Sequence, residues 1–276
     1  MKVLGIVLIV AFVILILAVR NASASKKAKA AAALAKATAP AIGTPTFSDT
    51  FGGTLDTSKW LVAQWKSADS KPGINLGSYV PEQLDFSTGT LRIQIDQVSD
   101  PTNGVNSKGG AIQSKQKFGF GTYTFVMRQS STSPTPDGAG STVTGGISSA
   151  FLYLPNSVSE IDLEFLGDNN AMWGTNWMNP TPSVPPNSTM KDSTEFSNAD
   201  LATGFHTYQL VWSAIAVSWY IDGKLIATHT DHVPQAPAFI ILQHRGTNSN
   251  LWGGTATLGV RRYAFFKSVS FVPEAN

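Results

Sequence analysis

Apolar and polar residues alternate in several segments of the chain after residue 45. In the segment 91–96, for example, Leu91, Ile93 and Ile95 alternate with polar residues. Successive side chains of a strand point to opposite faces, so this alternation predicts strands with one buried face and one polar face. No segment after residue 45 has a sustained helical period. Further strands are expected in the segments 121–128, 207–212 and 265–272.

Short turn sequences separate the expected strands. Asp222-Gly223 lies between the segments 217–221 and 224–228, and this dipeptide is a strong hairpin signal because both turn positions must tolerate a positive φ. Short strands separated by clusters of Gly, Pro and Asn indicate an antiparallel β-sandwich. The segment 129–146 is expected to be a long polar loop, and long loops in compact domains are often functional.

The composition fits a packed domain. Of the 276 residues, 42% are hydrophobic and 14% are charged, which allows a large core and argues against disorder. The net charge is only +2 and much of the Lys lies near the N-terminus, so we expect no nucleic-acid partner. The absence of Cys excludes disulfides and thiolate metal sites. The 7 Trp, 6 Tyr and 15 Phe suit a β-sheet core and, in part, a cleft in which sugar rings stack on aromatic faces.

The segment 159–165 carries acidic residues with a period of two. On a strand, Glu160, Asp162 and Glu164 share one face, and the apolar residues between them face a core. A purely structural strand would be expected to relieve this repulsion with interleaved Thr, Lys or Arg. A solvated acidic edge strand and a calcium site are alternatives, although calcium ligands are more often built on loops.

Paired carboxylates are also the groups that cleave glycosidic bonds. A retaining glycosidase needs a nucleophile and an acid/base about 5–5.5 Å apart. Residues four apart on a strand lie roughly 13 Å apart at Cα, but the side chains of Glu160 and Glu164 can bend toward each other on a concave sheet. Asp162 lies between them and can hydrogen-bond to the nucleophile. Close carboxylates push their pKa values apart, so that one stays ionised while another keeps its proton.

The segment Glu160–Gly167 resembles the catalytic strand of glycoside hydrolase family 16, which includes lichenases, laminarinases, agarases and xyloglucan transglycosylases. Its Glu-x-Asp-x-Glu form is similar to the unbulged variant of the lichenases and the transglycosylases. Further motifs that resemble this family follow in the family's order at Phe47–Trp60, Gly110–Arg128, Phe205–Tyr208 and Trp219–Gly223.

The resemblance implies a fold, a mechanism and an activity. The fold is an all-β antiparallel jelly-roll sandwich of the concanavalin A-like lectin/glucanase type, with a concave substrate cleft. The mechanism is retaining, with Glu160 as nucleophile, Asp162 as its helper and Glu164 as acid/base. The expected activity is that of an endo-β-glucanase, a glycoside hydrolase that cuts β-1,3 or mixed β-1,3-1,4 glucan. The alternatives are a transglycosylase on cell-wall glucan, a non-catalytic lectin-like carbohydrate-binding domain, and a structural envelope protein. A lectin would not need both Glu residues.

Five further residues are candidates for substrate binding. The segment Thr175–Trp177 resembles the next cleft strand of the family, where an amide and an aromatic ring meet the sugar. Lichenases often have Asn-Leu-Trp where this chain has Leu242–Arg245, and both this segment and the 129–146 loop are expected to shape sugar subsites. Trp252 suits a platform or a packing role, and Arg245 suits a sugar contact or a salt bridge. The substrate-binding candidates are Trp173, Asn176, Trp177, Arg245 and Trp252.

The N-terminus begins with an apolar run, Val3–Val19. Followed by Ala22–Ala24, it resembles a secretory signal peptide, and it is also just long enough to be an uncleaved membrane anchor. Basic residues after the run oppose export by the positive-inside rule. We still expect a secreted or cell-envelope protein, because the remaining chain resembles an enzyme for a polymer outside cells. The expected organisation is a signal peptide or anchor at 1–24, an Ala/Lys/Pro-rich linker at 25–45, and a catalytic domain at 46–276.

Few partners are expected beyond the polysaccharide. We expect a monomer without a cofactor or catalytic metal, in contact with a membrane only through an uncleaved N-terminal segment. A structural calcium ion is compatible with the sequence but cannot be read from it.

Overall fold

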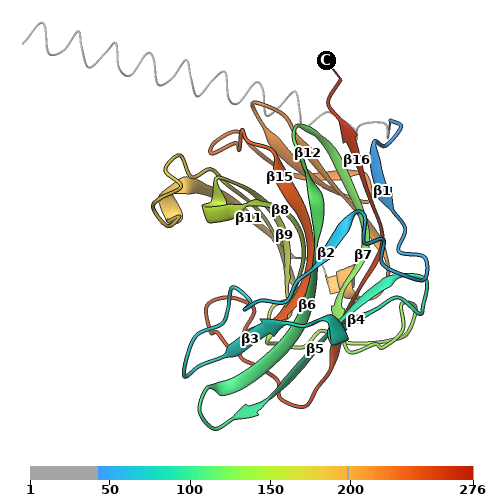
Figure 1. Ribbon diagram of the computed structural model, residues 1–276, viewed down its shortest axis with the longest axis vertical. Coiled ribbons are helices and arrows are strands. Elements are labelled where there is room, and N and C mark those ends of the chain that lie inside the picture. The colour runs from blue at the N-terminus through green and yellow to red at the C-terminus, as the bar shows by residue number, and fades with distance from the viewer. Residues whose placement is uncertain (1–42, 198, 276) are drawn as a thin grey trace, which may run out of the picture. The chain divides into compact units, whose positions relative to one another are not determined.

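The computed structural model describes residues 43–197 and 199–275, and nearly all of their regular structure is β-strand (Figure 1). These residues belong to one compact unit. The strands are β1 (Phe47–Asp49), β2 (Trp60–Val62), β3 (Leu76–Tyr79), β4 (Leu84–Asp85), β5 (Leu91–Asp100), β6 (Gly104–Phe118), β7 (Gly121–Ser131), β8 (Gly146–Leu154), β9 (Ser159–Leu166), β10 (Ala171–Trp177), β11 (Lys191–Ser197), β12 (His206–Trp212), β13 (Val217–Ile221), β14 (Lys224–His229), β15 (Ala238–Gly246) and β16 (Arg262–Pro273). Short 3-10 helices lie at η1 (Pro81–Gln83), η2 (Pro155–Ser157), η3 (Ser188–Met190) and η4 (Ala199–Ala202).

The strands pair along one continuous path, β11-β10-β9-β8-β15-β6-β5-β16-β7-β12-β13-β14. All pairs on this path are antiparallel, and only the short β3 pairs in parallel, with β6. The half from β11 to β6 forms a strongly curved sheet whose concave side is open in Figure 1. The other half, from β5 to β14, packs on its convex side. This arrangement confirms the all-β antiparallel jelly-roll sandwich.

One hydrophobic core lies between the two halves of the path. Ile161, Leu163 and Phe165 of β9 are buried in it, as their alternation with acidic residues predicts. Phe125 of β7 and Leu210 of β12 belong to the same core from the opposite half. Burying this many apolar side chains is the main favourable term for such a fold. The core therefore fixes β9 so that its acidic face must point to the concave side.

The predicted hairpin is present between β13 and β14. Asp222 and Gly223 have φ angles of 50° and 78°, which is the left-handed conformation that this turn requires. The strands expected at 91–96, 121–128, 207–212 and 265–272 lie within β5, β7, β12 and β16.

The loop predicted at 129–146 is shorter than expected and does not reach the cleft described below. Strand β7 continues to Ser131 and β8 begins at Gly146. The buried guanidinium of Arg128 donates to the carbonyl oxygens of Thr135 and Pro136, at 3.1 and 2.8 Å, and so holds the loop against the sandwich. None of its residues lines the cleft described below. The expectation that this loop shapes sugar subsites is therefore wrong.

The expected signal or anchor segment and nearly all of the expected linker, residues 1–42, lie outside the described residues. Within the described part of the chain, no helix has the length and apolarity needed to cross a membrane.

Candidate active site

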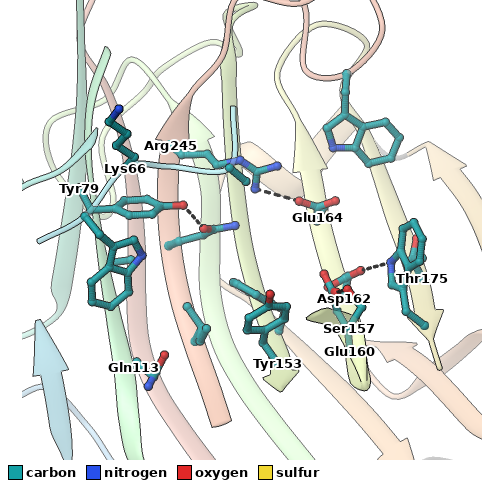
Figure 2. A pocket seen from close by; sticks show the side chains of 18 of the residues that line it. Lys66, Tyr79, Gln113, Tyr153, Ser157, Glu160, Asp162, Glu164, Thr175 and Arg245 are labelled. Atoms are coloured by element: carbon teal, nitrogen blue, oxygen red, sulfur yellow. Dashed lines mark hydrogen bonds and ion pairs between the residues drawn. The ribbon is translucent and has the colours of Figure 1, made fainter. Parts of the chain in front are cut away.

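The acidic face of β9 opens into a cleft on the concave side of the sheet. Strand β9 lies between β8 and β10, and its register places Glu160 opposite Tyr153 and Trp177. Glu164 lies opposite Ser149 and Trp173. Because side chains alternate along the strand, all three carboxylates point into the same space while the residues between them enter the core. Figure 2 shows these carboxylates above β9.

The cleft has a volume of about 670 Å³ and crosses the strands of the concave sheet. Its lining comes from β3, β6, β8, β9, β10, β11 and β15, from the 3-10 helix η2 and from two loops. The lining is rich in aromatic rings, with polar groups between them. Its aromatic members are Trp65, Tyr79, Phe151, Tyr153, Trp177 and Trp252.

Glu160 and Asp162 are neighbouring carboxyl groups whose pKa values are raised. Burial raises the pKa of Glu160 to about 7, against the opposing effect of a hydrogen bond donated by Ser157 Oγ. Asp162 is 4% exposed, and burial together with the charges of Glu160 and Glu164 raises its pKa well above the usual range. The indole nitrogen of Trp177 donates to Asp162 Oδ2 at 3.2 Å. Both shifts therefore favour the protonated forms of these two carboxyl groups.

Glu164 has a cationic partner. Arg245 Nη1 of β15 donates to Glu164 Oε1 at 2.9 Å, and the two side chains are only 8% and 15% exposed. The Nε of the same guanidinium donates to Asp69 Oδ2. Burial alone would lower the pKa of Arg245, but the charges of Asp69 and Glu164 raise it above its ordinary value. The sequence left a sugar contact and a salt bridge open for Arg245, and in this structure the salt bridge is formed.

Residues 77–261 match the model of the Glycosyl hydrolases family 16. The chain belongs to this family. The matched segment contains β9 and most of the cleft, including all three acidic residues.

The chain is similar in sequence to a Beta-glucanase and to a Crh-like protein. The chain is 27% identical over 220 residues to a Beta-glucanase of Acetivibrio thermocellus. This alignment covers 78% of this chain and 56% of that protein. It is 32% identical over 152 residues to the Crh-like protein 4 of Aspergillus fumigatus, covering 51% of this chain and 30% of that protein. The chain thus spans about half of the length of the first of these relatives.

Solved structures share the fold. A beta-1,3-1,4-glucanase (lichenase) derived from a mouse hindgut metagenome superposes with a TM-score of 0.66 at 21% identity, over 83% of this chain and 99% of that one. The catalytic domain of an endo-1,3-beta-glucanase (laminarinase) from Thermotoga petrophila gives a TM-score of 0.65 at 18% identity, over 84% and 98%. These neighbours are consistent with the jelly-roll architecture of the family.

Tryptophan rings flank the acidic residues of this family 16 chain on one side. Trp177 lines the cleft, and Lys191 Nζ lies 4.8 Å from the centre of its ring. Trp252 enters the lining from the loop between β15 and β16 and packs on Trp173, with ring centres 5.1 Å apart and planes at 55°. Trp177 and Trp252 therefore line the cleft, whereas Trp173 contacts Trp252 but is not among the residues that line it.

Asn176 does not belong to the cleft. It lies between Thr175 and Trp177 on β10 and therefore points to the opposite face. Its side chain is fully buried, and its amide nitrogen donates to the carbonyl oxygens of Asp231 and His232, at 2.8 Å each. The expectation that Asn176 binds substrate is wrong. Because side chains alternate along a strand, Asn176 belongs to the core face. Trp177, which was expected to bind substrate together with Asn176, belongs to the cleft face.

Several cleft residues were missed by the sequence analysis. Phe151 and Tyr153 lie on β8, opposite Asp162 and Glu160. Gln243 of β15 accepts a hydrogen bond from the Tyr79 hydroxyl and donates to Ser149 Oγ at 2.7 Å. Alternation in the segment 147–153 would have placed the two aromatic residues on one face. The contact between Tyr79 and Gln243 joins distant segments and left no local signal.

No group of three or more His, Asp or Glu residues in the described part of the chain is arranged to hold a metal ion.

Proposed function

We propose that this chain is a retaining endo-β-glucanase that hydrolyses β-1,3 or mixed β-1,3-1,4 glucan by double displacement. The observation that carries the proposal is the placement of Glu160, Asp162 and Glu164 on one strand face, inside an aromatic cleft. Membership of family 16 and the names of the relatives support the reaction class and the substrate class.

In the first step, a carboxylate oxygen of Glu160 attacks the anomeric carbon as the glycosidic C–O bond breaks. Glu164 gives its proton to the departing oxygen, and the sugar becomes bound to Glu160 as an ester. In the second step, Glu164 takes a proton from water while the water oxygen attacks the same carbon. The Glu160 carboxylate leaves, and the product keeps its original anomeric configuration.

Asp162 acts on Glu160 in this scheme. A hydrogen bond between the two carboxyl groups lowers the pKa of Glu160, against the larger effect of burial. Such a bond needs one proton between the pair, and in this scheme the proton lies on Asp162, whose pKa is raised by burial and by the charges of Glu160 and Glu164. Asp162 thereby favours the ionised, nucleophilic form of its neighbour.

The shape of the cleft supports cleavage within a chain. The lining runs across neighbouring strands from Trp65 and Tyr79 to Trp177 and Lys191, so β9 lies in the interior of the site. Sugar rings can pack on the aromatic side chains on both sides of β9, while Gln113 and Gln243 offer hydrogen bonds to hydroxyl groups.

Product analysis tests the proposal. The full chain is incubated with laminarin, mixed-linkage glucan, xyloglucan and agarose, and the products are resolved by chromatography and mass spectrometry. Short glucan oligosaccharides, with the retained anomer detected first by NMR, are expected. Products longer than the substrate in the presence of an acceptor oligosaccharide would assign transglycosylation instead. Binding without any product would indicate a lectin-like domain.

We also propose that the folded domain lies outside the cytoplasm, secreted or held at the cell envelope, and acts as a monomer. The apolar run Val3–Val19 and the cell-wall or environmental location of such glucans support the first point.

A further inference from the structure

The guanidinium of Arg245 connects a cleft loop to the acid/base candidate. Its Nη1 binds Glu164 Oε1 at 2.9 Å and its Nε binds Asp69, on the loop between β2 and β3. Figure 2 shows Arg245 reaching across the cleft floor toward Glu164. The planar fork of an arginine fixes the directions of both contacts, which a lysine could not do.

The loop that carries Asp69 is itself held in place. Asn75 donates from its amide to the carbonyl oxygens of Asp69, at 3.2 Å, and Gly246, at 3.3 Å. Ser107 Oγ donates to the amide oxygen of Asn75 at 2.6 Å. Asn75 is thus a buried link between the loop and the residue after Arg245. The position of Asp69 is determined by the fold, so the position of Arg245 is too.

Glu164 has more anionic than cationic side chains around it. On its own strand lie Glu160 and Asp162, and Asp69 lies beyond Arg245. The nearest cation is Arg245. The other ionisable groups around the cleft are Tyr79, Tyr153, Lys66 and Lys191.

We propose that Arg245, anchored by Asp69, is a positioning residue that orients Glu164 and stabilises its carboxylate form, and so sets the pH at which Glu164 can give and take the catalytic proton. The inference rests on the proposed function for the role of Glu164. Arg245 binds Oε1, so the same carboxyl group can present Oε2 to the glycosidic oxygen. Glu164 must gain a proton in each cycle. Arg245 holds its side chain in place and gives it a cationic neighbour among the surrounding carboxylates.

Substitutions of Arg245 and of its other anionic partner, Asp69, are expected to have opposite effects on Glu164. Arg245→Gln removes the cation but keeps a hydrogen-bond donor, so the carboxylate form of Glu164 is destabilised by its acidic neighbours. Asp69→Asn keeps an oxygen that accepts from Nε but removes the charge, which leaves the guanidinium with Glu164 as its single anionic partner. The first change favours protonation of Glu164 and the second opposes it.

The pH dependence of kcat/KM measures these effects with a glucan oligosaccharide, whose departing oxygen needs a proton. The limb that belongs to Glu164 is identified by its disappearance when an activated aryl glycoside replaces the oligosaccharide, because departure of an activated group needs no proton. That limb is expected to move upward by about 1 pH unit or more in Arg245→Gln, as for loss of an opposite charge at ion-pair distance. It is expected to move downward, by a smaller amount, in Asp69→Asn. Arg261→Gln is the matched control, since Arg261 pairs with Asp96 at 3.0 Å outside the cleft.

An unchanged limb in a folded Arg245→Gln variant, or shifts in the same direction in both variants, would overturn the inference. Carboxyl ¹³C NMR of the full chain gives an independent readout, with the Glu164 signal assigned by its loss in Glu164→Gln. If no glucan is cut but this signal titrates at a higher pH in Arg245→Gln, the proposed function fails, while the stabilisation of the Glu164 carboxylate by Arg245 holds. If glucan is cut and the signal does not move, only the inference fails.

Discussion

The indole nitrogen of Trp219 donates a hydrogen bond to the backbone carbonyl oxygen of Asp162, at 2.9 Å. Trp219 lies on β13, in the half of the sandwich behind the concave sheet, and its side chain is fully buried. A Cβ atom on Gly174 would come within 3.0 Å of the same ring, so the glycine on β10 makes room for it. Trp219 therefore supports the catalytic strand from behind, at its central acidic residue.

Trp219→Phe should lower kcat by about tenfold, because loss of this support lets the strand shift relative to a bound sugar. The substitution should also destabilise the fold by about 1–3 kcal/mol, through the lost hydrogen bond and the space left. Trp212→Phe is the matched control. Trp212 is also buried, and its indole donates at 2.9 Å to the carbonyl oxygen of Pro234 and not to a residue of β9. Steady-state kinetics and thermal unfolding of both variants separate the effects, and an equal loss of kcat in both would show that Trp219 has only a structural role.

The acidic pair gives the second prediction. Glu160→Gln and Glu164→Gln should each reduce kcat by several orders of magnitude on a natural glucan while the circular dichroism spectrum stays unchanged. Each amide keeps the size of the side chain but cannot act as a nucleophile or transfer a proton. Turnover above about a tenth of the wild-type value in either variant would remove that residue from the mechanism.

Much of this site follows from local sequence pattern. Strict alternation on 159–165 places three carboxylates on one face and three apolar residues in the core, and the structure has this arrangement. The same rule applied strictly to β10 would have excluded Asn176. What no local pattern could reveal is the ion-pair network, because Asp69 and Arg245 are 176 positions apart and Arg245 and Glu164 are 81 apart. Such contacts depend on how the strands are ordered in the sheet and on loop conformation.

Stability should depend on pH through Glu160. Burial raises its pKa to about 7, above the ordinary 4.5, so the folded chain binds this proton more tightly than the unfolded chain. The stability that the protonated group contributes is complete below pH 4.5 and is lost as the pH rises through 7.

Glu160→Gln cannot ionise and should therefore be more stable than the wild type at pH 8, with no such advantage at pH 4. A gain of about 1 kcal/mol would raise Tm by roughly 2–4 °C in a domain of this size. Differential scanning calorimetry at both pH values measures the difference, with Glu82→Gln, at an exposed position of η1, as the control. A gain that is the same at pH 4 and pH 8 would contradict this account.

The N-terminal segment gives a prediction about location. When the full chain is expressed in a host with a secretory pathway, we expect the folded domain outside the cytoplasm, with cleavage after Ala24. N-terminal sequencing of the exported protein decides between cleavage and a retained anchor. Replacing one apolar residue of Val3–Val19 with Arg should block export without changing the domain. A domain found only in the cytosol would refute the export proposal.

The roles of the two Glu residues can be separated by one small anion. If Glu160 is the nucleophile, Glu160→Ala leaves a space on the face of the sugar opposite the leaving group. Azide can enter this space and attack the anomeric carbon of an activated aryl glycoside, which expels the aryl group and gives a glycosyl azide of inverted configuration. If Glu164 is the acid/base, Glu164→Ala still forms the ester with Glu160, because an activated leaving group needs no proton. It then accumulates that ester, and azide should displace Glu160 to give a product of retained configuration. NMR of the two azides reads out the assignment directly. The opposite pair of anomers would exchange the two roles, and the absence of rescue in both folded variants would count against double displacement.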